Sequence, residues 1–174
     1  MIPATIRQAT PADAALATDI SRRNFTQSFG SAYPAADLAS FLAQSYSLAR
    51  HAAWLDDDRH ALFLLERGTE VLGHALVGPC ALPHADVNAS DGELKRLYIL
   101  KHAHGSGLGS LLIHTALAWL LKDGARTLWV GVWSENFRAQ KLYQRYGFTH
   151  AGEYHFEVGA TRDFEFIYRR AAGS

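Results

Sequence analysis

The spacing of apolar residues changes several times along the chain, and each change marks a new element. Short segments rich in apolar, β-branched and aromatic residues predict strands at 4–9, 60–66, 71–77, 93–100, 127–133, 148–156 and 162–169. Segments with an apolar residue every three or four positions predict helices at 10–30, 34–55, 108–123 and 136–146, the second as one helix or two. This order of elements predicts an α/β (α+β) architecture.

Capping residues mark the ends of two predicted helices. Thr10, Pro11 and Asp13 supply an N-cap, a proline suited to the first turn and an acid close to the helix start. Asn136 is an N-cap for the last helix, and Gly147 stands where a C-terminal glycine is expected. These helices are therefore predicted to begin after Thr10 and after Asn136.

The predicted strand at 93–100 does not alternate strictly between apolar and polar residues. Leu94 and Leu97 are separated by an odd number of positions, so a regular strand turns them to opposite faces. A β-bulge would bring both to one face, whereas a strand buried on both faces needs none. Before this strand, residues 79–91 are predicted to form a polar surface loop, and we interpret Asp86 and Asp91 as solvated acids of that loop.

The turn that follows is rich in glycine. Residues 104–110 read His-Gly-Ser-Gly-Leu-Gly-Ser and join the strand to the helix at 108–123. Glycine permits positive φ angles, and the first amides of a helix have no internal acceptor and carry a partial positive charge. This order of elements predicts a cradle for phosphate or pyrophosphate, although such a turn can also be a simple tight connection.

Two common glycine-rich signatures are excluded. A Walker-type loop requires Gly-Lys-Ser/Thr, which does not occur in the chain. The dinucleotide fingerprint would place a glycine at Leu112, and an acid about 20 residues after the turn, where Leu128, Trp129 and Val130 stand. The turn is therefore not predicted to bind a nucleotide in either way.

Composition and charge limit the number of domains and the partners that the protein can be expected to have. With 174 residues and 48% hydrophobic content, the chain is predicted to form a single domain, 1–174. Its 17 basic and 17 acidic residues balance, so neither nucleic acid nor a membrane surface is an expected partner. The nine histidines and the lone Cys80 show no metal-binding spacing, and no metal is expected. No signal peptide or apolar run long enough to span a membrane is found, so we expect a cytoplasmic location.

Residues 93–121 resemble the acyl-CoA-binding segment of the GCN5-related N-acetyltransferases (GNAT), whose pattern is Gln/Arg-x-x-Gly-x-Gly/Ala. Here His104 stands in place of the Gln or Arg. The resemblance implies a mixed, mostly antiparallel sheet of about seven strands, flanked by helices and splayed at its centre, and acetyl-CoA as cosubstrate. The implied contacts to acetyl-CoA are Leu97, Tyr98, Ile99, His104, Gly105, Ser106, Gly107, Leu108, Gly109 and Ser110.

A second segment resembles the other CoA-contacting helix of this family. Asn136, Ala139 and Tyr143 follow its Asn-x-x-Ala-x-x-x-Tyr pattern, which ends in Gly-Phe at 147–148. The segments NFTQSF, ELKRLYI and LWVGVWSEN are similar to bacterial spermine/spermidine N-acetyltransferases of the PaiA type. That similarity implies a polyamine or related small amine as acceptor. The implied acceptor-site residues are Phe25, Phe29, Tyr33, Tyr46, Glu93 and Trp133.

The chemistry of amine acetylation assigns further roles. An alkyl amine with pKa near 10.4 is protonated at pH 7, and holding it neutral costs about 4 to 5 kcal/mol. By its position, Glu93 resembles the catalytic glutamate of the histone-type relatives and is the candidate base, directly or through a water; otherwise it is an exposed acid at a strand end. The amide of Ile99 is the candidate oxyanion donor, and Tyr143 the candidate donor to the leaving thiolate.

Two other functions stay open from the sequence. One is acetylation of protein or peptide N-termini, which needs a groove for extended backbone in place of a pocket. The other is a non-catalytic sensor that binds acyl-CoA. The sequence also leaves the oligomeric state open, with a homodimer among the options.

Overall fold

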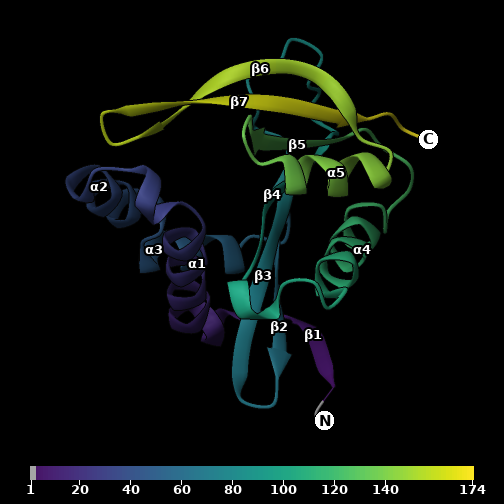
Figure 1. Ribbon diagram of the computed structural model, residues 1–174. Helices are drawn as coiled ribbons and strands as arrows, with labels where there is room; N and C mark the ends of the chain where they lie inside the picture. Colours follow the sequence, from purple (N-terminus) through teal and green to yellow (C-terminus); the bar gives the residue numbers. More distant parts are fainter. Residues whose placement is uncertain (1–2) are drawn as a thin grey trace.

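The computed structural model describes residues 3–174 and contains a seven-stranded sheet in the order β1-β2-β3-β4-β5-β7-β6 (Figure 1). The strands are β1 (Ala4–Gln8), β2 (Ala61–Arg67), β3 (Glu70–Pro79), β4 (Gly92–Ile99), β5 (Leu128–Trp133), β6 (Thr149–Val158) and β7 (Thr161–Arg170). The helices are α1 (Ala14–Phe29), α2 (Ala35–Ser45), α3 (Leu48–Leu55), α4 (Leu108–Leu120) and α5 (Phe137–Arg145), with short 3-10 turns η1 (Pro11–Asp13), η2 (Gly30–Ala32) and η3 (Lys101–Ala103). The predicted mixed sheet of about seven strands is confirmed; the predicted domain also includes residues 1–2, which lie outside the described part.

The sheet is split between β4 and β5. All neighbouring strands run antiparallel except this pair, which is parallel and joined only at Gly92 with Leu128 and at Glu93 with Trp129. Beyond Glu93 the two strands separate, and β5, β6 and β7 turn across one end of the long central strands (Figure 1). The predicted splaying of the central strands is thereby confirmed.

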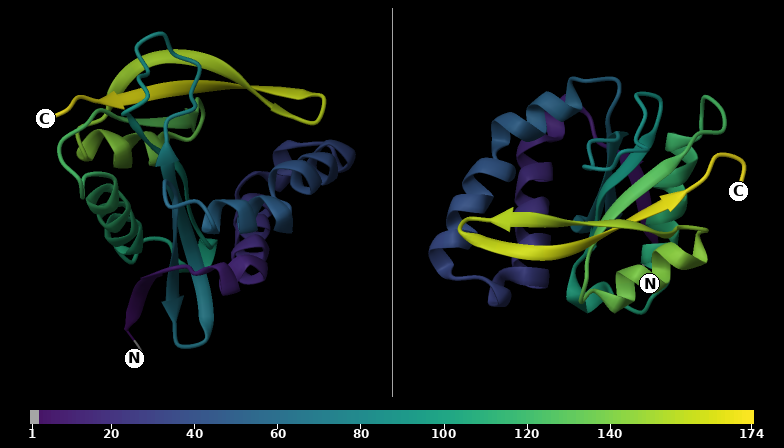
Figure 2. Two further views of the ribbon diagram at one scale, coloured as in Figure 1. Left: turned by 180° about the vertical axis from the view of Figure 1, so that it is seen from behind. Right: turned by 90° about the horizontal axis from the view of Figure 1, so that it is seen from above.

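Helices cover both faces of the sheet. α1 packs on β3 and β4 and against α3, while α4 packs on the opposite face of β3 and β4 (Figures 1 and 2). β2 shows why both faces are buried, because Leu62 and Leu64 enter the core under α1 and the alternate residues Phe63 and Leu65 enter the core under α4. Because both faces of β2 are buried, apolar and polar residues do not alternate along this strand.

A β-bulge in β4 confirms the expectation from Leu94 and Leu97. The register between β3 and β4 shifts, so that Leu76 pairs with Arg96 and Val77 with Leu94, leaving Lys95 as the extra residue. Leu94 and Leu97 consequently both pack against the core on the α4 side.

A buried polar chain joins α1 to its neighbours. The Ser21 hydroxyl bonds the Nε2 atoms of His51 on α3 and His74 on β3, at 3.0 and 3.1 Å, and His74 Nδ1 lies 2.9 Å from the Asn24 side chain. All four side chains are fully buried. Burial lowers the pKa of His51 to about 4 and that of His74 well below its usual range, so both rings are neutral near pH 7.

One interpretation of the loop before β4 is wrong. Asp86 is exposed as expected, but Asp91 is buried, and its Oδ2 accepts hydrogen bonds from the Trp129 indole at 2.7 Å and from the Asn88 amide at 3.0 Å. The loop folds back so that the Asp91 carbonyl accepts from the Cys80 amide. The Asp91 side chain therefore holds the loop against β5. This contact forms only because β4 and β5 pair and bring Trp129 next to Asp91.

Replacing Asp91 by alanine should lower the free energy of unfolding by about 1–3 kcal/mol, because the buried Trp129 N–H loses its acceptor. Asp86→Ala on the same loop is the matched control and should change it by less than about 0.5 kcal/mol. Urea unfolding measures both variants. Equal stability of the two would contradict the assigned role of Asp91.

Candidate active site

Two cavities meet where β4 and β5 part. The turn cavity, about 530 Å³, lies against the glycine turn and α5, and the aromatic cavity, about 610 Å³, lies between α1–α3 and the β6–β7 hairpin. Residues of four elements line both of them and form their junction: Phe29, Leu97, Tyr98, Trp133, Asn136, Ala139 and Tyr143. A molecule can therefore reach from one cavity into the other through the split sheet.

The glycine turn has the backbone that an anion cradle requires. Gly105 and Gly107 have φ angles of 81° and 78°, and a Cβ at either position would meet nothing within 4 Å, so the need for glycine here is conformational. Among residues 3–174, the amides of residues 105–109 find no protein acceptor. They stand at the N-terminus of α4, where the helix dipole adds partial positive charge, and they fit a phosphate or pyrophosphate.

Two predicted residues of the turn contribute no side chain to the cavity. Leu108 is buried in the core under α4, and the Ser106 hydroxyl donates to the Ala103 carbonyl at 2.7 Å. Only their backbone amides are available to a ligand. Gly105, Gly107, Gly109 and Ser110 do line the turn cavity, together with His104.

His104 joins the turn to α5. Its Nε2 lies 2.7 Å from the Ile99 carbonyl, which can only accept, so Nε2 carries the hydrogen. Nδ1 is then an acceptor and receives the Arg138 Nη1 donor at 2.8 Å. His104 thus turns toward Arg138, and the Arg138 cation lines the turn cavity. Sequence reasoning missed Arg138, although a cation two positions after Asn136 was a visible signal.

β4 presents free amides to the gap. The Leu100 amide donates to the Leu72 carbonyl across to β3, so alternation turns the amides of Leu97 and Ile99 away from β3. Within residues 3–174 no strand pairs with these amides, because β5 has already separated. These two amides can donate to a ligand along the edge of β4, which suits the role predicted for Ile99.

Tyr143 on α5 and Asn136, the N-cap of that helix, lie at the junction. The Asn136 Oδ1 accepts the Ala139 amide at 3.1 Å, which confirms the predicted N-cap. Tyr143 is only 5% exposed, and burial, with a further contribution from the Glu165 charge, raises the pKa of its phenol above the usual range. Complete proton transfer from this phenol to a thiolate is correspondingly unfavourable, so Tyr143 is suited to donate a hydrogen bond.

The aromatic cavity contains all four N-terminal residues predicted to line an acceptor pocket. The Phe25 ring has its centroid 5.2 Å from Phe29, 6.1 Å from Tyr33 and 5.2 Å from Tyr46. Phe29 also packs edge-on against Tyr98 and Trp133, with both centroids at 5.9 Å. These rings form a continuous wall from the cavity interior to the junction.

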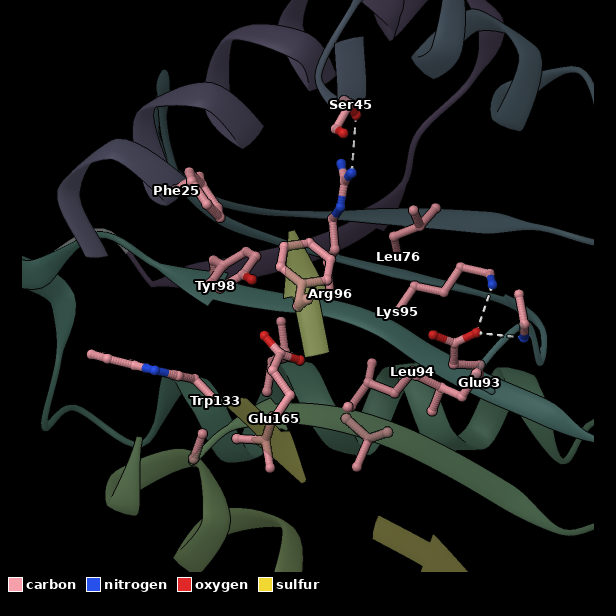
Figure 3. A pocket seen from close by; sticks show the side chains of 18 of the residues that line it. Phe25, Ser45, Leu76, Glu93, Leu94, Lys95, Arg96, Tyr98, Trp133 and Glu165 are labelled. Carbon is pink, nitrogen blue, oxygen red and sulfur yellow. Dashed lines mark hydrogen bonds and ion pairs between the residues drawn. The ribbon is translucent and has the colours of Figure 1, made fainter. Parts of the chain in front are cut away.

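Most charged groups in this cavity already have partners (Figure 3). The Glu93 Oε2 accepts from Lys95 Nζ at 2.7 Å and from the Ala81 amide at 2.9 Å. The Arg96 guanidinium lies 3.8 Å from the centroid of Tyr46 and donates to the Ser45 carbonyl. Glu93 is neutralised by Lys95, whereas among residues 3–174 Arg96 has no carboxylate partner and its buried Nη1 has no hydrogen-bond partner.

Glu165 on β7 differs from these groups. It accepts a hydrogen bond from the Tyr154 hydroxyl at 2.7 Å, and burial raises the pKa of its carboxyl to about 7. Sequence reasoning missed Glu165, because it stands in an ordinary alternating strand and belongs to no motif.

Comparison with known proteins agrees with the geometry. The profile of the acetyltransferase (GNAT) family matches residues 22–148. An uncharacterised N-acetyltransferase of Mycobacterium tuberculosis is 32% identical over 85% of this chain and 90% of its own. A Bacillus subtilis subsp. natto protein named "Probable spermine N(1)-acetyltransferase" is 33% identical over 50% of this chain and 58% of its own.

Solved structures share the fold at low identity. PaiA N-acetyltransferase from Thermoplasma acidophilum, in complex with coenzyme A, has a TM-score of 0.78 at 16% identity, covering 98% of this chain and 99% of its own. The Escherichia coli ribosomal-protein-S18-alanine N-acetyltransferase has a TM-score of 0.72 at 21% identity, covering 99% and 96%.

The chain belongs to the GNAT family of acetyltransferases. It is an N-acetyltransferase that uses acetyl-CoA as cosubstrate. Within residues 3–174, no group of three or more His, Cys, Asp or Glu side chains could hold a metal ion. In the same part of the chain, no helix is long and apolar enough to cross a membrane.

Tyr143→Phe should lower kcat by about tenfold to a hundredfold, the effect of losing one hydrogen bond to a developing charge. The dissociation constant of acetyl-CoA should change by less than twofold, since the ring remains in place. Steady-state kinetics and calorimetry measure the two quantities. Tyr168→Phe, a buried phenol outside both cavities, is the control, and an unchanged kcat in Tyr143→Phe would remove Tyr143 from the mechanism.

Proposed function

We propose that this N-acetyltransferase acts on a primary amine of a small, flexible cation, with a polyamine as the best candidate. The observation that carries the proposal is the set of hydrogen bonds that holds the tip of the β6–β7 hairpin to α2, on one side of the aromatic cavity. The acceptor then enters the aromatic cavity, while acetyl-CoA is held in the turn cavity. The individual residue roles below are part of this proposal.

The hairpin is fastened to the N-terminal helices by several side chains. The Asp37 carboxylate on α2 accepts from the Ala160 amide at 3.1 Å and from the Thr161 hydroxyl at 2.8 Å, at the hairpin tip. The Tyr33 hydroxyl donates to the Asp163 carboxylate on β7. The hairpin tip accordingly reaches over α2 (Figures 1 and 2). An extended peptide would have to displace these bonds, whereas a small molecule would not.

The lining of the aromatic cavity suits an alkylammonium ion. Aromatic faces attract such cations electrostatically, and the attraction grows as water is excluded. The carboxylates of Glu93, Glu157 and Glu165 line the same cavity as the cations Arg50, Lys95 and Arg96. Glu93 pairs with Lys95 and Glu157 with Arg162, whereas within residues 3–174 Glu165 has no cationic partner. The aromatic rings can bind the methylene chain of a polyamine, and the Glu165 carboxylate can pair with one of its charged nitrogens. The relative named for spermine acetylation supports the same acceptor class.

The proposed reaction is direct attack within a ternary complex. The amides of the glycine turn, with Arg138, hold the phosphates, and the amides of Leu97 and Ile99 support the thioester arm and its carbonyl oxygen. Tyr143 donates to the leaving sulfur. Glu93 is the base that the family resemblance proposes, and its pairing with Lys95 has to be overcome for that role. A cytoplasmic location and a homodimer likewise remain proposals.

The alternative acceptor is a protein N-terminus, as in the name of the E. coli structural neighbour. That function favours an open groove, and the fastened hairpin argues against it. The second alternative, a sensor without turnover, is disfavoured by the connection between the two cavities at Tyr143. Both alternatives predict a different substrate profile.

The test is acetyl-CoA-dependent release of free thiol with spermidine, spermine, small aminoglycosides and N-terminal peptides as acceptors. We expect turnover on polyamines, with kcat/KM at least tenfold above that of any peptide. Turnover on peptides alone would replace the proposed acceptor. Tight binding of acetyl-CoA without turnover on any amine would favour the sensor.

A further inference from the structure

We infer that Glu165, and not Glu93, removes the proton from the acceptor amine. The inference rests on N-acetyltransfer to an amine and does not require the acceptor to be a polyamine. It follows from the position of Glu165 in the sheet, from the charges around both glutamates and from the hydrogen bond to Tyr154.

The sheet register places Glu165 in the aromatic cavity, next to the junction residue Trp133. Glu165 pairs directly with Trp133 on β5 and with Tyr154 on β6, and Trp133 lines both cavities. Glu93 pairs with Trp129, four positions earlier on β5, which is about 13 Å along the strand at about 3.3 Å per residue. Figure 3 shows Glu93 and Trp133 at opposite ends of the cavity, with Glu165 between them. An amine that attacks a thioester at the junction therefore lies nearer to Glu165 than to Glu93.

The two carboxylates also differ in how they are neutralised. Glu93 forms a 2.7 Å ion pair with Lys95 and accepts a backbone amide at the same oxygen. In the described chain, residues 3–174, no lysine or arginine forms an ion pair with Glu165. Its hydrogen-bond donor is the neutral phenol of Tyr154. Glu165 is thus a carboxylate without a counter-ion, and an incoming ammonium group can supply one.

The surroundings of Glu165 bring the pKa of its carboxyl close to the pH at which enzymes usually operate. The pKa of Glu165 is raised to about 7 by burial, which the Tyr154 hydrogen bond partly offsets and the negative charge of Asp163 reinforces. A general base is most effective when its pKa lies near the operating pH. A carboxylate of this kind can both pair with an ammonium group and accept its proton.

Other titratable groups face the same space from every packed element. Burial raises the pKa of Tyr33 after η2, of Tyr46 after α2 and of Tyr98 on β4, and the Glu165 charge adds to each of these shifts. It does the same to Tyr143 on α5 and Tyr154 on β6. Arg96 is directed onto Tyr46, and Glu93 contributes a weaker raising effect at Tyr154. These phenols stay protonated near pH 7, so Glu165 is the group in this set that titrates there.

The protons balance as follows. The Glu165 carboxylate takes one proton from R–NH3⁺, leaving R–NH2 with its lone pair free. That lone pair forms the new C–N bond to the thioester carbonyl carbon, and the C–S bond breaks to give a thiolate. The nitrogen loses its second proton and the thiolate gains one as CoA–SH, while Glu165 later returns its proton to water. The net reaction releases one proton.

The first test compares Glu165→Gln with Glu93→Gln in the full chain, using whichever amine the enzyme acetylates. Glu165→Gln should lower kcat/KM at pH 8 by about 10²- to 10⁴-fold and leave the acetyl-CoA dissociation constant within twofold. The loss in kcat/KM should be smaller for an amine of pKa below 6, because this amine is already neutral at pH 8 when it binds. A loss of less than threefold, or the same loss with the weakly basic amine, would overturn the inference.

The second test measures the pH profile of kcat/KM and locates the pH below which kcat/KM falls. Tyr154→Phe removes a donor that stabilises the Glu165 carboxylate, so its pKa rises and the fall moves to higher pH. Asp163→Asn removes a negative charge that raises the pKa, so the fall moves to lower pH. A merely structural role would not give opposite shifts, and two unmoved profiles, or a fall that vanishes only in Glu93→Gln, would overturn the inference.

The outcomes separate this inference from the proposed acceptor. Failure on polyamines, with turnover on another amine that depends on Glu165, removes only the polyamine proposal. Turnover on polyamines that survives in Glu165→Gln removes only the role of Glu165. Absence of turnover on every amine removes both.

Discussion

The gap between β4 and β5 is the constraint on which the whole site depends. A strand inside a sheet normally has its amides and carbonyls paired on both sides, and buried backbone groups seldom remain without partners. Here the parallel ladder stops at Glu93, so the edge of β4 toward β5 requires an outside acceptor. The bulge at Lys95 and the turning away of β5, β7 and β6 keep the strands apart. Both cavities exist because this ladder is incomplete.

Local signals allowed much of this fold to be predicted. The cap at Asn136, the positive φ angles at Gly105 and Gly107 and the bulge between Leu94 and Leu97 each depend on a few consecutive residues. The sequence contains those interactions directly. The family resemblance supplied the sheet topology, which no local pattern determines.

The parts that were missed depend on contacts between distant residues. Asp91 was interpreted as a solvated acid, yet its partner Trp129 lies 38 positions away. Glu165 stands among alternating polar and apolar residues of β7, and only its pairing with Trp133 and Tyr154 brings it into the cavity. The charge state of a buried carboxyl depends on what surrounds it in space, so composition and spacing could not reveal it.

The hydrogen bond between His104 and Arg138 links the identities of two positions that lie 34 residues apart. A neutral imidazole accepts from the guanidinium, so His104 tolerates Arg138 as its neighbour. The family pattern also allows arginine at the first position of the turn motif, and an arginine there would bring two cations together here. The two positions are therefore coupled: as long as Arg138 stands opposite the turn, the side chain at position 104 has to be one that can accept a hydrogen bond.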